Sequence, residues 1–163
     1  MSEARPAGAP RSLFSHRSFE IESKKLAVWA ATLADQKKAQ NIAVLDVSEH
    51  LKVVDWFVLL TCTSRPHVKA VSQEIHVRLK EGGEVHRPQE GDDLRWWTLL
   101  DYGDVVVHVL QQDAREYYDL DRLYKECPRL DWAAESLPPG LPGLEGEAAS
   151  GVSGAVAKNR EEQ

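Results

Sequence analysis

The stretch RWWTLLDYGDVVVHVLQQDAREYYDL, residues 95–120, decides the fold. Residues 95–100 and 105–111 are rich in aromatic and branched aliphatic side chains, which predicts two strands. The short DYGD segment between them predicts a tight turn, with its glycine at the position that can take a positive φ. A helix is predicted to open at Asp113, a residue suited to capping a helix N-terminus. The stretch therefore predicts a β-hairpin followed by a helix.

The chain before this hairpin predicts a helix and a pair of strands. Residues 19–38 show apolar residues at i, i+3, i+4 and i+7, which is one face of a helix. These residues are Leu26, Trp29, Ala30 and Leu33. The apolar run at residues 42–47 predicts a buried strand, and DWFVLLTCT at 55–63 predicts a second one.

The run SRPHVKAVSQEIHVRLKEGG, residues 64–83, is the clearest helix in the chain. Ser64 can cap its N-terminus, and the glycine pair at its end can stop it. A further strand is predicted near residues 84–86. The buried stripe predicted for the last helix consists of Tyr117, Leu120, Leu123 or Tyr124, and Cys127.

These elements predict an α/β domain with a mixed five-stranded sheet and flanking helices over residues 20–132. Residues 1–19 are expected to be a disordered N-terminal segment, although their arginines and serines leave an organelle transit peptide open. Residues 133–163 are rich in Pro, Gly, Ser and Ala and contain no aromatic residue, so a disordered tail is predicted there.

Composition narrows the classes of partner. The 163 residues carry a formal net charge of −6, which suits a basic protein surface better than bare nucleic acid, since phosphate binding needs clustered Lys and Arg. Cys62 and Cys127 lie far apart without a CxxC spacing, so neither a disulfide framework nor a zinc site is expected. No uncharged apolar run reaches the roughly 20 residues that span a bilayer, so no membrane association is predicted.

Two hypotheses compete for the polar residues of the opening stretch. Asp101 and Asp104 border the turn, where aspartate commonly bonds nearby backbone N–H groups. The alternative is a magnesium-binding pair in a nucleotide-using transferase, but the sequence contains no P-loop, GxGxxG or GxSxG motif. His108 alternates with hydrophobic residues on a strand, which favours a buried or interface residue over a metal ligand. We therefore predict no metal and no cofactor, and the transferase stays open as the alternative.

The tryptophan pair indicates a surface that binds a partner. Adjacent Trp96 and Trp97 must point to opposite faces of a strand. Either a helix buries each of them, or one is exposed and becomes covered by another macromolecule, since tryptophan is enriched at interface hot spots. The pattern alone leaves both options open.

The residues 45–75 (LDVSEHLKVVDWFVLLTCTSRPHVKAVSQEI) and 90–124 (EGDDLRWWTLLDYGDVVVHVLQQDAREYYDLDRLY) resemble the ribosomal silencing factor family, also called the Iojap family. The most specific segments are DYGDVVVHVL and REYYDLDRLY. Asp121 stands where the family usually has Glu, and Tyr124 where it usually has Trp. The resemblance implies a binding protein and not an enzyme, with a fold similar to that of nucleotidyltransferases but without their activity.

The resemblance also implies a function. Family members bind the large ribosomal subunit at its fourteenth protein, block joining of the small subunit, and repress translation when nutrients are scarce. A minor contact with ribosomal RNA and a homodimer off the ribosome are further expectations. A cytoplasmic location is expected, with the mitochondrion or chloroplast, and a role in organelle ribosome assembly, as the alternative. The partner-binding residues implied in this sequence are Trp97, Thr98, Leu99, Asp101, His108, Arg115 and Tyr118.

Overall fold

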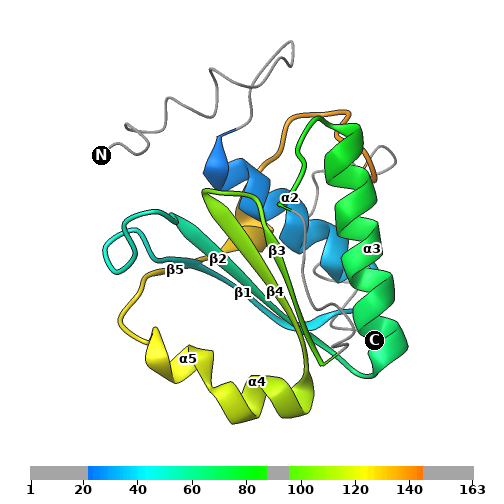
Figure 1. The fold of residues 1–163 in the computed structure, drawn as a ribbon. Helices are drawn as coiled ribbons and strands as arrows, with labels where there is room; N and C mark the ends of the chain where they lie inside the picture. The colour runs from blue at the N-terminus through cyan, green and yellow to red at the C-terminus, as the bar shows by residue number, and fades with distance from the viewer. Residues whose placement is uncertain (1–21, 88–95, 145–163) are drawn as a thin grey trace.

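The computed structural model describes residues 22–87 and 96–144. The N-terminal segment 1–19 that we expect to be disordered lies outside the described residues. In Figure 1, helices α2 and α3 lie on one side of a twisted sheet, and the short helices α4 and α5 lie on the other. No helix among the described residues is long and apolar enough to cross a membrane.

The elements follow one another in the order that the sequence predicts for most of the chain. They are α2 (Ser23–Gln36), β1 (Gln40–Asp46), β2 (Trp56–Cys62), α3 (Arg65–Glu81), β3 (Trp97–Asp101), β4 (Val105–Gln111), α4 (Gln112–Tyr118), α5 (Leu120–Leu123), β5 (Arg129–Leu130) and the 3-10 turn η1 (Trp132–Ala134).

The sheet is mixed and five-stranded, as predicted, with strand order β3-β4-β2-β1-β5. Among the strands of the described residues, only β2 and β4 run parallel, and the other neighbouring strands are antiparallel. The valine-rich strand β4 lies inside the sheet and is buried on both faces, which explains why its sequence shows no polar alternation. The nucleotidyltransferase-like character implied by the resemblance stays a prediction.

One predicted strand is wrong. Residues 84–86 do not form a strand: the N–H of Glu84 bonds back to the carbonyl of Leu79 at the end of α3, and Arg87 makes a single backbone bond to Asp101. Isolated bonds of this kind fix the path of the chain without building a ladder. The fifth strand is instead β5, two residues that pair with β1 at Val44 and Leu45.

Helix α3 begins and ends where the sequence predicts. Ser64 Oγ accepts a hydrogen bond from the N–H of His67 at 3.2 Å. At the other end, a Cβ added to Gly82 would lie 2.5 Å from Trp29 Cη2 of α2, so the two helices cross closely there. The α2 stripe predicted from the sequence is fully buried, and it packs with α3 on one face of the sheet.

The predicted last helix is interrupted. Asp119 adopts a left-handed conformation (φ 48°), which ends α4 and redirects the chain into α5. Leu120 and Cys127 are buried as predicted, but Tyr117 and Leu123 are 74% and 66% exposed. The predicted stripe is therefore wrong for Tyr117, and of the two alternatives Leu123 and Tyr124 it is Tyr124 that packs against the core.

Part of the predicted disordered tail is folded: residues 135–144 form a C-terminal strap, and residues 145–163 lie outside the described residues. Leu141 and Leu144 are 4% and 6% exposed within the α2–α3 core, and Trp29 Nε1 donates a hydrogen bond to the Pro142 carbonyl at 3.1 Å. The prediction of disorder is thus wrong for the strap. It was based on the average composition of the tail, whereas a few leucines are enough to supply the apolar contacts that order this segment.

We expect Leu141→Ala to lower the unfolding free energy by about 2–4 kcal/mol, because it removes a fully packed leucine from the core. Urea denaturation monitored by circular dichroism measures the change. The control is Leu123→Ala, which truncates an exposed leucine and should change stability by less than about 0.5 kcal/mol. Equal losses in both variants would show that the strap contributes nothing to stability.

Candidate functional site: an aromatic surface at the sheet edge

Four aromatic side chains gather where β3 meets α4. Trp97 lies on Tyr118 with ring centroids 4.5 Å apart, and Trp96 lies 5.6 Å from Tyr118 and 6.1 Å from Tyr117. The two tyrosines contact each other edge to face at 4.9 Å. We name Trp96, Trp97, Tyr117 and Tyr118 the aromatic cluster. It lies on the sheet face opposite α2 and α3, because Trp97 packs with the second core cluster.

Much of this cluster is open to solvent. Tyr117 is 74% exposed, Tyr118 39%, and Leu99, which follows Trp97 on the same face of β3, 40%. Both tryptophans are half-buried. Contrary to the prediction, the two tryptophans do not lie on opposite faces. Trp96 precedes β3, so the alternation of side chains along a strand does not apply to it, and both indole rings contact Tyr118.

His108 lies beneath the cluster on β4 and is 5% exposed. Trp97 Nε1 donates a hydrogen bond to His108 Nδ1 at 3.3 Å, and the ring of Phe57 packs against the imidazole from the other side at 4.5 Å. Burial, aided by the positive charge of Arg115, lowers the pKa of His108 to about 4. The imidazole is therefore neutral at physiological pH, and its burial leaves little of it accessible to a partner.

We expect His108 to make the protein less stable in acid. Its folded-state pKa of about 4 lies below the 6.5 of an unperturbed histidine, so protonation favours the unfolded chain. Stability should fall as the pH drops below about 6.5 and lose roughly 3 kcal/mol from this group once the pH is below about 4. Urea titrations across this range check the effect. His108→Leu should show a correspondingly smaller loss; identical pH profiles for both proteins would contradict the assignment.

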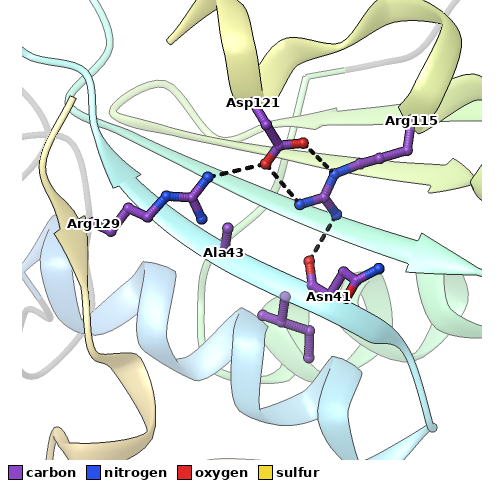
Figure 2. Close-up of a pocket in the computed structure, with 6 residues that line it drawn as sticks. Asn41, Ala43, Arg115, Asp121 and Arg129 are labelled. Carbon is purple, nitrogen blue, oxygen red and sulfur yellow. Dashed lines mark hydrogen bonds and ion pairs between the residues drawn. The ribbon is translucent and has the colours of Figure 1, made fainter. Parts of the chain in front are cut away.

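Arg115 points inward from α4 and holds the helices to the sheet (Figure 2). Its guanidinium makes a paired contact with Asp121, at 2.8 and 3.0 Å, and donates to Asn41 O at 2.7 Å and Thr61 Oγ1 at 2.9 Å. Arg129 also reaches Asp121, at 3.1 Å. These bonds, first of all those from Arg115, lower the pKa of Asp121.

This side-chain arrangement gives Arg115 a structural role. Only 11% of its side chain is exposed, so the predicted contact of Arg115 with a partner does not fit its position. The pocket that it lines with Asn41, Asp121 and Arg129 lies over β1, and there both guanidiniums bond the single carboxylate of Asp121. Arg115 instead fixes α4, and α4 carries the two tyrosines of the aromatic cluster.

In the turn between β3 and β4, Asp101 has the side-chain geometry predicted for a turn aspartate. Asp101 Oδ1 accepts the N–H of Gly103 at 2.8 Å, and Gly103 takes a φ of 91°. The backbone carbonyl of Asp104 accepts the N–H groups of Asp55 and Trp56. Within residues 22–87 and 96–144, no group of three or more His, Cys, Asp or Glu side chains is placed to hold a metal ion. The thiol of Cys62 is buried, which raises its pKa to about 12.

The structure thus brings together only some of the residues that the sequence singles out. Trp97, Leu99 and Tyr118 share one surface, with His108 under it. Thr98 alternates to the other face of β3, and Asp101 lies at the far end of that strand. Trp96 and Tyr117 are members that the sequence interpretation missed. The adjacent pair Tyr117–Tyr118 on a short helix was a usable signal, because two neighbouring side chains cannot both face the core.

The fold and this surface define a small α/β domain with an exposed aromatic cluster, a kind of surface that commonly binds macromolecules. The profile of the family described as "Ribosomal silencing factor during starvation" matches residues 20–158. The chain is 36% identical over 111 residues to the ribosomal silencing factor RsfS of Bacillus subtilis, a match that covers 68% of this chain and 94% of the relative.

A crystal structure of a Chromobacterium violaceum protein has the same fold, with a TM-score of 0.62 and 32% identity over 64% of this chain and 88% of that one. An organellar relative, the mouse protein named "Mitochondrial assembly of ribosomal large subunit protein 1", is 29% identical over 73% of this chain and 56% of its own length. The chain belongs to the ribosomal silencing factor family, as its motifs predict.

Proposed function

We propose that this protein binds the large ribosomal subunit through the aromatic cluster, at the fourteenth protein of that subunit. Bound there, it blocks joining of the small subunit and represses translation when nutrients are scarce. Family membership supports the ribosome as the target, and the names of the bacterial relatives are those of silencing factors. A homodimer off the ribosome and a minor contact with ribosomal RNA remain part of the proposal.

The observation that carries the proposal is the exposure of the cluster. A tyrosine that is 74% exposed beside half-buried tryptophans leaves a contiguous apolar surface in water. Contiguous apolar patches of this kind mark interaction sites, and Trp and Tyr are the residues that most often dominate binding energy there. The net charge of −6 favours approach to a basic surface, which a ribosomal protein provides.

The proposed mechanism is steric. A rigid sheet with helices on both faces would occupy the surface that the small subunit must approach. Such a mechanism requires affinity and a fixed orientation, and it requires no reacting group. Asp101 and Cys62 are consistent with this mechanism. The bond from Gly103 gives Asp101 a role in the turn, and burial gives the Cys62 thiol a role in the core, so neither needs a catalytic role to explain its presence.

The test is sedimentation of the protein with purified ribosomal subunits. We expect comigration with large subunits, and we expect excess protein to reduce the formation of joined ribosomes when small subunits are added. Crosslinking from the aromatic cluster should identify the fourteenth large-subunit protein. Failure to comigrate, together with normal subunit joining in excess protein, would refute the proposed function.

A role in assembling the large subunit of an organelle ribosome is the second candidate. It is favoured by the similarity to the mouse mitochondrial protein whose name states such a role. Fractionation of cells separates the two: a cytoplasmic silencing factor associates with mature large subunits, whereas an assembly factor associates with immature particles inside an organelle. Cleavage of the chain near residue 20 in cells would support import.

A further inference from the structure

The indole of Trp97 is held by contacts on several sides. Tyr118 packs on its ring at 4.5 Å, and His108 lies at 5.8 Å on the strand below. The indole N–H donates to His108 Nδ1 at 3.3 Å. In the strand register, Trp97 is paired with Leu110 and Leu99 with His108, so Trp97 and His108 are diagonal neighbours, within reach for an aromatic side chain.

Histidine is the side chain of β4 that can accept this bond. The residues on either side of it on the same face of β4 are Val106 and Leu110, which carry no polar side-chain atom. A tryptophan N–H is a donor only, so the indole needs an acceptor wherever water does not reach it. Without the imidazole, this face of β4 would offer the indole no side-chain acceptor.

The same bond has a cost at the other ring nitrogen. Because Nδ1 accepts, the proton of the neutral ring must be on Nε2. Nε2 is buried and has no hydrogen-bond partner among the described residues. An apolar residue at position 108 would avoid this penalty, so packing alone does not explain a histidine there. The hydrogen bond to Trp97 is the interaction that a histidine makes and a leucine could not.

We infer that His108 is a positioning residue that fixes the orientation of the Trp97 indole within the aromatic cluster. This inference rests on the proposed function, because it concerns the same binding surface. A tryptophan held in one rotamer loses no side-chain entropy when a partner covers it, so binding is tighter than with a mobile ring. His108 itself does not touch the partner, since it is covered by Trp97 and Phe57.

Two substitutions with opposite expectations test this role. His108→Asn places an acceptor oxygen where Nδ1 lies but leaves a gap beyond it, whereas His108→Leu fills the space and removes the acceptor. If His108 positions Trp97, the leucine variant should bind large subunits roughly three- to tenfold more weakly, and the asparagine variant should stay close to the wild type. If His108 only fills space, the order reverses, and that result would overturn the inference.

A second readout does not need the ribosome. With ¹⁵N-labelled tryptophan, the Trp97 indole N–H resonance, assigned from Trp97→Phe, reports the hydrogen bond in the free protein. We expect its hydrogen exchange to accelerate in His108→Leu and to remain slow in His108→Asn. An unchanged indole N–H in His108→Leu would overturn the positioning role. Absence of subunit binding by the wild type, with the NMR difference present, would refute the proposed function and leave the positioning role intact.

Discussion

Trp97→Ala is expected to weaken binding to the large ribosomal subunit by about thirtyfold or more. Truncation of a central aromatic anchor typically costs about 2 kcal/mol or more of binding free energy, and about 1.4 kcal/mol is a factor of ten. Trp97 is the member of the aromatic cluster that contacts both Tyr118 and the buried His108. Its loss would remove the centre of the surface and free the neighbouring tyrosine. Quantitative sedimentation or surface immobilisation of large subunits measures the change.

The control for this variant is Trp132→Ala. Trp132 is also a half-buried tryptophan, but it packs on the core cluster of α2 and α3, on the other face of the sheet. Both substitutions create a similar packing defect, and only the first should affect binding. Tyr117→Ala adds a probe without a folding cost, since that side chain is 74% exposed. Wild-type affinity in Trp97→Ala would place the docking surface elsewhere on the domain.

The sequence was sufficient for elements that carry a strong local signal. Helix α3 has a capping serine, a regular apolar stripe and a glycine stop, and each of these acts within a few residues of the chain. The β3–β4 hairpin has apolar strands around a short turn with glycine at positive φ. Such signals do not depend on the rest of the fold, which is why they could be interpreted without it.

The features that were mispredicted either depend on distant partners or rest on the conformation of a single residue. Strand β5 has two residues and forms because Val44 and Leu45 of β1 pair with it. It is too short to show the alternating hydrophobic pattern by which a strand is recognised in a sequence. The break at Asp119 needs only one residue in a left-handed conformation, and the apolar spacing on either side hides it. The strap has the composition of a disordered segment, but its Leu141 and Leu144 pack into the core formed by residues of α2 and α3.

The candidate site shows the same division. The family motif and the enrichment of tryptophan at interface hot spots indicate Trp97, and the motif that follows it along the chain indicates Tyr118. Arg115 belongs to that motif as well, but its role could not be inferred without the positions of Thr61 and Asn41, which lie more than fifty residues away in the chain. A motif shows which side chains matter, and only the fold distinguishes an exposed contact from a buried support.

Arg115→Ala is accordingly expected to lower the unfolding free energy by about 3 kcal/mol. It removes a mostly buried guanidinium that bonds Asp121, Thr61 and Asn41, and the hydroxyl of Thr61, 1% exposed, would lose that bond. The matched control is Arg122→Ala. Arg122 also pairs with an aspartate, Asp119, at 3.0 Å, but its side chain is 78% exposed, so the change should stay within about 0.5 kcal/mol. Urea denaturation at neutral pH measures both.

Acid denaturation gives an independent check on the same group. Arg115 is the main cause of the lowered pKa of Asp121, so the stability from this pair is present above the unfolded aspartate's pKa of 3.8 and is lost as the pH falls through the lower folded value. Arg115→Ala should lose less stability in that window than the wild type. Arg115→Lys should fall between them, because an ammonium keeps the attraction to Asp121 but cannot form the paired contact and reach Thr61 and Asn41 together. If the lysine variant is as stable as the wild type yet binds large subunits much more weakly, Arg115 contacts the partner after all.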